Sequence, residues 1–206
     1  MIDFFRSQSL DKKIGGIYAL LTYGSWGLLP IYWKLLYTAS ALEILAHRML
    51  WSMVFVFGFL AVQKRLSEIL ELFKSSRNIW LLLFTSLLLG CNWFVYIYAI
   101  NSDQVIEASL GYYINPLLNV LMGFIFLRER LKLLQYIALV LAALGVLNFI
   151  WDFGSLPWIA LSLSFTFALY GLVRKVIPVK TLVGLLIETV LLVPLAIIMI
   201  SIWMID

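Results

Sequence analysis

Charged residues are scarce in this sequence of 206 residues. Asp, Glu, Lys and Arg together make up 13% of the chain, whereas hydrophobic residues make up 64%. A soluble domain must cover its surface with polar groups, and an average one is about 45–50% apolar and roughly 25% charged. This composition excludes a cytosolic enzyme, a secreted domain, a disordered chain and a nucleic-acid-binding protein. It predicts a protein that crosses a membrane several times.

Residues that build metal and catalytic sites are also rare. The chain has one cysteine, Cys91, and one histidine, His47. A single cysteine allows no intrachain disulfide, and these two residues do not make a metal-ligand set. The sequence also lacks a glycine-rich phosphate loop and a Ser-His-Asp set. We therefore expect no cofactor, no metal and no enzymatic activity.

Long apolar runs, by contrast, are abundant. A helix needs about 20 mostly apolar residues to cross the hydrocarbon core of a bilayer. The runs are continuous, which argues against a β-barrel, and the first is too long for a signal peptide. The predicted fold is an all-α polytopic membrane protein with about seven transmembrane helices. The predicted spans are residues 14–36, 41–62, 79–100, 104–127, 133–151, 156–173 and 181–203.

The connections between these spans predict the orientation of the chain. All but two of the 15 Lys and Arg residues lie in the N-terminal tail or after the second, fourth and sixth spans. The positive-inside rule therefore places the N-terminus in the cytoplasm and, after seven crossings, the C-terminus outside. Seven-helix receptors and retinal proteins have the opposite orientation. The last span also lacks the lysine that a retinal protein requires.

A weak internal repeat is found when the sequence is shifted by 141 residues. Ala19 then aligns with Ala160, and His47 aligns with Glu188. Because five spans separate the copies, the copies have opposite orientations in the membrane. Inverted repeats are typical of transporters, in which the substrate site lies near the midplane at the repeat interface. We expect a first five-helix repeat over residues 1–151 and the first two helices of an inverted second repeat over residues 152–206.

Five sequence blocks are similar to one transporter family. They follow one another in family order across residues 14–190: YGSWGLLPIYWKLL, ALEILAHRMLWS, GCNWFVYIYAIN, EASLGYYINPLLNVLMGFIFLRERL and GSLPWIALSLSFTFALYGLVRK. They resemble the RarD-type permeases of the EamA branch of the drug/metabolite transporter superfamily. This resemblance implies a ten-helix inner-membrane permease built from two inverted five-helix repeats, with both termini in the cytoplasm. It also implies three further helices, so we expect a chain that is truncated at its C-terminus.

The predicted span 104–127 carries the richest set of polar groups. Asn115 and Asn119 lie one turn apart, on a face that also holds two glycines. Tyr112 and Pro116 flank this face, and Pro116 leaves the carbonyl group of Tyr112 without its helical partner. Two interpretations remain open. The face either lines a polar substrate path or packs tightly on another helix, with the asparagines bonded across the interface.

The predicted span 41–62 carries three ionisable residues near its outer end. Glu43 and His47 are one turn apart and can pair. Arg48 lies deep enough to need a carboxylate, a carbonyl or a substrate anion, unless it snorkels to the outer boundary. His47 is either a proton carrier or a hydrogen-bonded structural residue.

Polar residues in three other spans complete the candidate substrate-binding set. Glu188 lies well inside span 181–203, where it either carries a proton or pairs with a basic residue of another helix. Polar-tipped side chains suit a pocket for amphipathic or ring-bearing molecules, although lipid-facing bulk is the alternative. These further candidates are Asn92 and Tyr96 in the third span and Tyr23 and Trp26 in the first.

The function that these features predict is a secondary permease for small organic metabolites or drugs in the plasma (inner) membrane. Its expected partners are the lipid bilayer and a small-molecule substrate, with no nucleic acid, and a homodimer is compatible with the sequence. The alternative is a non-transporting remnant of a permease or a membrane scaffold, which the expected truncation would favour.

Overall fold

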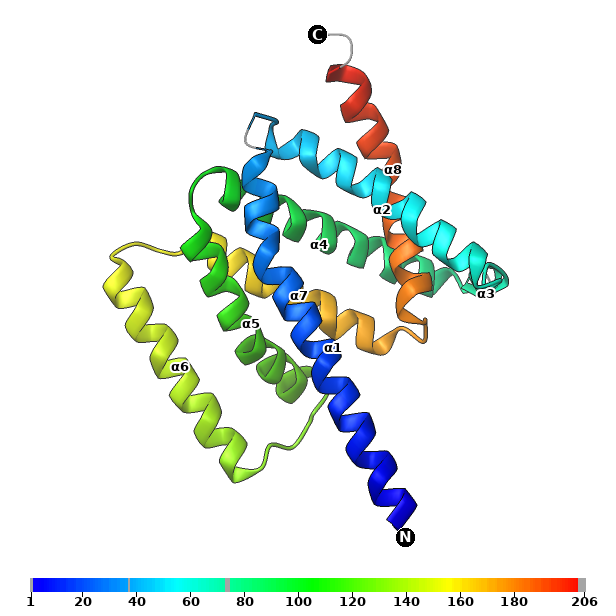
Figure 1. The fold of residues 1–206 in the computed structure, drawn as a ribbon. Helices are drawn as coiled ribbons and strands as arrows, with labels where there is room; N and C mark the ends of the chain where they lie inside the picture. Colours follow the sequence, from blue (N-terminus) through cyan, green and yellow to red (C-terminus); the bar gives the residue numbers. More distant parts are fainter. Residues whose placement is uncertain (1, 37, 73–74, 204–206) are drawn as a thin grey trace. The chain divides into compact units, whose positions relative to one another are not determined.

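The computed structural model describes residues 2–36, 38–72 and 75–203. These residues form α-helices joined by short connections, and no strand occurs among them (Figure 1). The chain divides into two compact units, residues 1–38 and residues 39–206, and each unit is described by itself.

The first unit consists of one long helix, α1 (Ile2–Leu35), with Pro30 near its end. The second unit contains the remaining helices. These are α2 (Ala41–Val62), α3 (Ser67–Leu72), α4 (Ser76–Asn101), α5 (Val105–Phe126), α6 (Leu133–Phe153), α7 (Trp158–Val176) and α8 (Thr181–Trp203).

Seven of the described helices are long and apolar enough to cross a membrane: the segment Ile14–Leu35 of α1, and all of the others except α3. The chain is therefore an all-α, multi-pass membrane protein, which confirms the predicted fold class. The short helix α3 was not predicted. It lies in the basic connection after α2, and its six residues are too few to be found by a search for long apolar runs.

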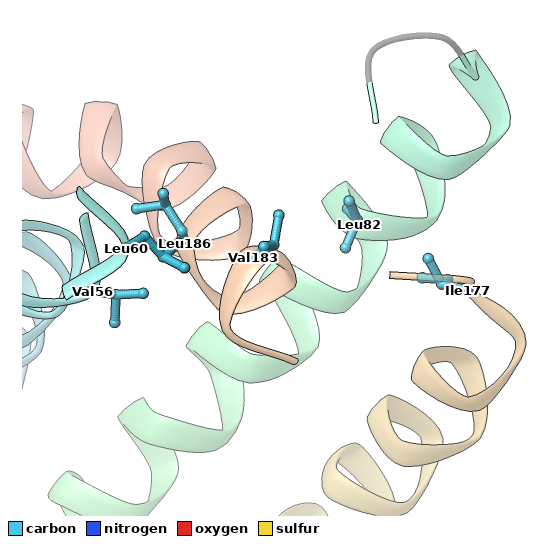
Figure 2. Packing of buried hydrophobic residues seen from close by; sticks show 6 residues of the cluster. All are labelled: Val56, Leu60, Leu82, Ile177, Val183 and Leu186. Atoms are coloured by element: carbon cyan, nitrogen blue, oxygen red, sulfur yellow. The ribbon is translucent and has the colours of Figure 1, made fainter. Parts of the chain in front are cut away.

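Two helix pairs form the core of the second unit. Helix α5 packs along α7, helix α2 packs along α8, and α4 contacts both α7 and α8. A cluster of buried apolar side chains joins α2, α4, α8 and the connection between α7 and α8. Figure 2 shows its six members, Val56, Leu60, Leu82, Ile177, Val183 and Leu186.

Close helix contacts depend on small residues at defined positions. A Cβ atom on Gly111 of α5 would lie 3.0 Å from the carbonyl oxygen of Ala160 and 3.0 Å from the Cβ atom of Leu163, both on α7. Glycine therefore lets the two backbones approach closely, as is usual where membrane helices pack. Glu107, one turn before Gly111 on α5, adds a polar contact beside it, because its Oε1 accepts a 2.8 Å hydrogen bond from the backbone amide of Ile159 in the first turn of α7.

Candidate functional site

A line of hydrogen-bonded polar side chains, which we call the polar seam, joins α4, α5 and α7. The amide group of Asn92 donates to the carbonyl oxygen of Leu163 and to the hydroxyl of Thr166, at 2.9 Å each. Asn115 donates to the carbonyl oxygen of Ser164 at 3.2 Å. Asn119 then donates to Oδ1 of Asn115 at 2.7 Å. The seam therefore runs from the α4–α7 contact onto α5.

Burial divides the members of the polar seam into two groups. Asn92 and Asn115 are 3% and 8% exposed, so their amides serve mainly as bonds between helices. Asn119 is exposed, one helical turn further along α5. On the α5 face, Asn115 is thus placed as the packing interpretation expects, whereas Asn119 remains accessible. Pro116, at the centre of α5, is exposed and lies outside the hydrogen-bonded line.

Asn119 lines a cleft of about 190 Å³ between α5 and α7. On one side of the cleft, a Cβ atom on Gly171 of α7 would lie 3.5 Å from Oδ1 of Asn119, which is an ordinary contact distance, so α7 approaches Asn119 closely there. An ion pair between Glu129 and Lys175 contributes to the lining at the end of both helices. The remaining lining residues are Met122, Gly123, Leu127, Ala168 and Leu172.

A second polar centre surrounds Glu188 in α8, whose side chain is fully buried. Its Oε1 accepts a 2.6 Å hydrogen bond from the Thr85 hydroxyl of α4, and its Oε2 accepts one of 3.1 Å from the Tyr170 hydroxyl of α7. The Nε atom of Arg174 lies 3.7 Å from Oε1. We call these four residues the Glu188 cluster. Glu188 thus has the basic partner on another helix that one sequence interpretation required.

Arg174 is the member of the Glu188 cluster that sequence analysis missed. It follows the end of the predicted span 156–173, but it lies in the last turn of α7 and its side chain is only 11% exposed. Gly184 of α8 provides the space, since a Cβ atom there would collide with the Arg174 guanidinium. A glycine opposite an arginine at the end of an apolar run is the only signal that could have identified this contact.

Three other predicted candidates, Arg48, Tyr96 and Tyr112, lie near one another in a third cluster. The guanidinium of Arg48 stacks over the ring of Trp93 at 4.2 Å from the ring centroid, a cation–π contact. The rings of Tyr96 and Tyr112 meet edge to face, with centroids 5.6 Å apart. These residues come from α2, α4 and α5. Trp93 thus belongs with the candidates, although nothing in the sequence distinguishes it from its aromatic neighbours.

The other predicted candidates are not brought into these clusters. His47 is exposed, and within the described residues no hydrogen bond or ion pair joins it to Glu43, although their spacing would allow one. The backbone amide of Glu43 instead bonds to the Ser40 hydroxyl at 3.2 Å, which caps α2. Tyr23 and Trp26 belong to the first unit, where their rings meet edge to face at 6.0 Å.

A further ion pair connects α3 with the segment before α8. Glu68 contacts Arg65 at 3.0 Å and Lys180 at 2.9 Å. Hydrogen bonds from Arg65 and then from Lys180 lower the pKa of Glu68 to about 2, so this carboxylate stays charged at neutral pH. Among the described residues, no group of three His, Cys, Asp or Glu side chains is placed to hold a metal ion.

Comparison with known proteins identifies relatives of this chain. The sequence profile of the EamA-like transporter family matches residues 13–151. Protein RarD of Salmonella typhi is 47% identical over 186 residues, and Protein RarD of Escherichia coli (strain K12) is 46% identical over 186 residues. Both matches cover 90% of this chain and 63% of the relative.

A relative from a different bacterium gives the same result. The uncharacterized transporter YojE of Bacillus subtilis (strain 168) is 45% identical over 192 residues, which cover 92% of this chain and 64% of the relative. The chain thus spans a little less than two thirds of the length of these three relatives. No solved structure matches it.

Proposed function

This chain belongs to the EamA-like transporter family as a RarD-type member, and on that premise we propose that it moves small organic molecules across the plasma membrane as a secondary transporter. The observation that carries this proposal is the polar seam together with the cleft in which it ends. Polar side chains inside a membrane are costly and are retained mainly where they have partners or a function. Here a line of amides between apolar helices leads to an accessible asparagine.

The chemistry of the polar seam suits reversible binding of a polar solute. Hydrogen bonds between membrane helices contribute only about 0.6–2 kcal/mol each. A substrate amide, hydroxyl or carboxylate can therefore compete for Asn119, and through it for Asn115, without unfolding the helices. The cleft of about 190 Å³ beside Asn119 provides the space for such a molecule.

The basic residues suggest from which side the substrate enters. Lys175 and Glu129 lie at the ends of helices whose connections carry the positive charge. By the positive-inside rule, the cleft faces the cytoplasm and the N-terminus lies there too. We propose this orientation, and we place the Glu129–Lys175 pair at the cytoplasmic mouth of the path.

Transport can be measured directly with the 206-residue chain. The protein is reconstituted in liposomes, and uptake of a panel of labelled organic acids, amino acids and amphipathic drugs is compared with that of empty liposomes. Asn115→Leu removes the amide that connects the polar seam to Asn119, and we expect it to lower uptake at least tenfold. Asn148→Leu makes the same change at an exposed position of α6 and should leave uptake unchanged.

Two results would contradict the proposal. Uptake equal to that of empty liposomes for every compound would favour a non-transporting membrane scaffold. Equal uptake by the Asn115→Leu protein and the unmodified chain would show transport by a route that does not involve the polar seam.

A further inference from the structure

The Glu188 cluster has an imbalance between its hydrogen-bond donors and acceptors. Each carboxylate oxygen of Glu188 already accepts a hydroxyl group, from Thr85 or from Tyr170. Arg174 approaches the carboxylate only to 3.7 Å, which is longer than a hydrogen bond. Its Nη1 atom is buried and has no hydrogen-bond partner. The cluster therefore keeps an unused donor on its positively charged member.

An unused N–H on a buried guanidinium is costly, and its preferred partner is an oxyanion. Arginine presents its donors in a planar fork that matches the two oxygens of a carboxylate. From this arrangement we infer that Arg174 and Glu188 together form a proton-linked binding site for a small carboxylate. The inference deepens the proposed transport function by naming a substrate class, and it is tested by binding and not by flux.

The need for a proton follows from the net charge of the site when a carboxylate is bound. Arg174 and Glu188 balance one another when the site is empty, so a bound carboxylate would leave one net negative charge in a medium of low dielectric constant. Protonation of Glu188 removes that charge. The proton comes from water and resides on a Glu188 oxygen, and Arg174 is then free to turn its fork to the ligand.

The groups around Glu188 support a single proton site. The charged and titratable groups that face it are Arg174 and Tyr170 of α7, and α4 contributes the uncharged Thr85 hydroxyl. The described side chains of α2 and α3 contribute none there. Charge changes at this site should therefore fall on Glu188.

The walls of the site limit the size of the ligand. Three buried apolar residues lie two or three positions in the sequence from members of the cluster: Leu82 in α4, Leu186 in α8 and Ile177 after α7. They are 0%, 2% and 4% exposed. Close packing around the cluster restricts the ligand to a compact headgroup, so acetate is a suitable probe and its neutral analogue acetamide is the control.

The test is calorimetric titration of the purified 206-residue chain in detergent, with acetate in two buffers of different ionisation enthalpy. We expect saturable binding of acetate but not of acetamide, and uptake of about one proton per acetate at neutral pH. Binding should weaken by about tenfold per pH unit as the pH rises through the range in which free Glu188 is ionised.

Substitutions separate the role of Arg174 in binding acetate from the role of Glu188 in taking up the proton. Arg174→Gln should abolish acetate binding, and Glu188→Gln should keep binding but take up no proton and show no pH dependence. Arg77→Gln, an exposed arginine at the start of α4, should behave as the unmodified chain. If Arg174→Gln does not fold, Arg174→Lys is used instead, because it keeps the positive charge but lacks the forked donors. We expect it to bind acetate at least tenfold more weakly than the unmodified chain.

Three outcomes would overturn the inference: no acetate binding by the folded chain, unchanged binding after removal of the Arg174 fork, or proton uptake that persists in Glu188→Gln. Because transport is not measured, a chain that binds acetate but shows no uptake in liposomes would refute the proposed function and leave this inference standing.

Discussion

At the scale of single residues, burial and hydrogen-bond partners separate buried candidates from exposed ones, whereas sequence patterns could only list them. Glu188 is recognisable in the sequence because it is a carboxylate deep in an apolar run. Its partner is not, because Arg174 stands at the end of a different run, where basic residues ordinarily face water. The long arginine side chain lets a residue of the last helical turn reach back into the core. Spacing along one helix holds no information about such a contact.

Thr85 provides a residue-scale test of the Glu188 cluster. Its hydroxyl donates a 2.6 Å bond to a buried carboxylate, and hydrogen bonds to charged groups contribute about 1.5–3 kcal/mol. Thr85→Val keeps the shape of the side chain and removes the donor, so we expect a loss of stability of about 2 kcal/mol in detergent unfolding experiments. Thr22→Val, at an exposed position of α1, is the matched control and should change stability by less than about 0.5 kcal/mol. Equal effects of the two substitutions would mean that the Thr85 bond does not stabilise the fold.

At the scale of helices, apolar length predicted the spans well and their ends less well. The predicted span 104–127 corresponds to α5 (Val105–Phe126). The predicted span 156–173 ends before Arg174, yet α7 continues to Val176, because backbone hydrogen bonds extend a helix past the point where its side chains become charged. The packing of α5 against α7 was not predicted, because hydropathy indicates that a helix crosses the membrane but not which other helix it packs against.

The close contact of α5 with α7 gives a prediction at this scale. A methyl group on Gly111 would press on the Ala160 carbonyl and on the Leu163 Cβ atom, both fixed to the backbone of α7. Gly111→Ala should therefore push the helices apart and destabilise the chain by about 1–3 kcal/mol in detergent unfolding experiments.

Gly145 of α6 is the matched control for this substitution. No atom lies within 4 Å of a Cβ atom built there, so Gly145→Ala should be neutral or stabilise the chain by up to about 1 kcal/mol through helix propensity. A Gly111→Ala protein as stable as the unmodified chain would show that the α5–α7 interface is loosely packed.

At the scale of the whole molecule, composition was sufficient for the class of the protein and insufficient for its site. A charged fraction of 13% and seven apolar runs identify a multi-pass membrane protein without any structure. Asn92 and Asn115 were recognised individually, but their connection through the backbone of α7 requires the fold, because main-chain carbonyls are the same at every position. The inverted repeat remains a prediction.

The orientation of the chain is a prediction of this scale. Cysteine substitutions at Ser102 and Ser155 should react with a membrane-impermeant thiol reagent in intact cells, because the connections that hold them carry no basic residue. A cysteine at Ser75 should react only after lysis. These variants need a Cys91→Ser background, since Cys91 is exposed in α4. Labelling of position 75 from outside would reverse the orientation.

The most direct test of the account is whether water enters the membrane between α5 and α7. In a Cys91→Ser background, Asn119→Cys and Val120→Cys are treated with a charged methanethiosulfonate reagent in membrane vesicles. Both positions are exposed on the surface of the protein, but only residue 119 lines the cleft. We predict rapid modification at position 119 and little at position 120, which should face lipid. Equal protection of both positions, or faster reaction at position 120, would contradict a polar path along the seam.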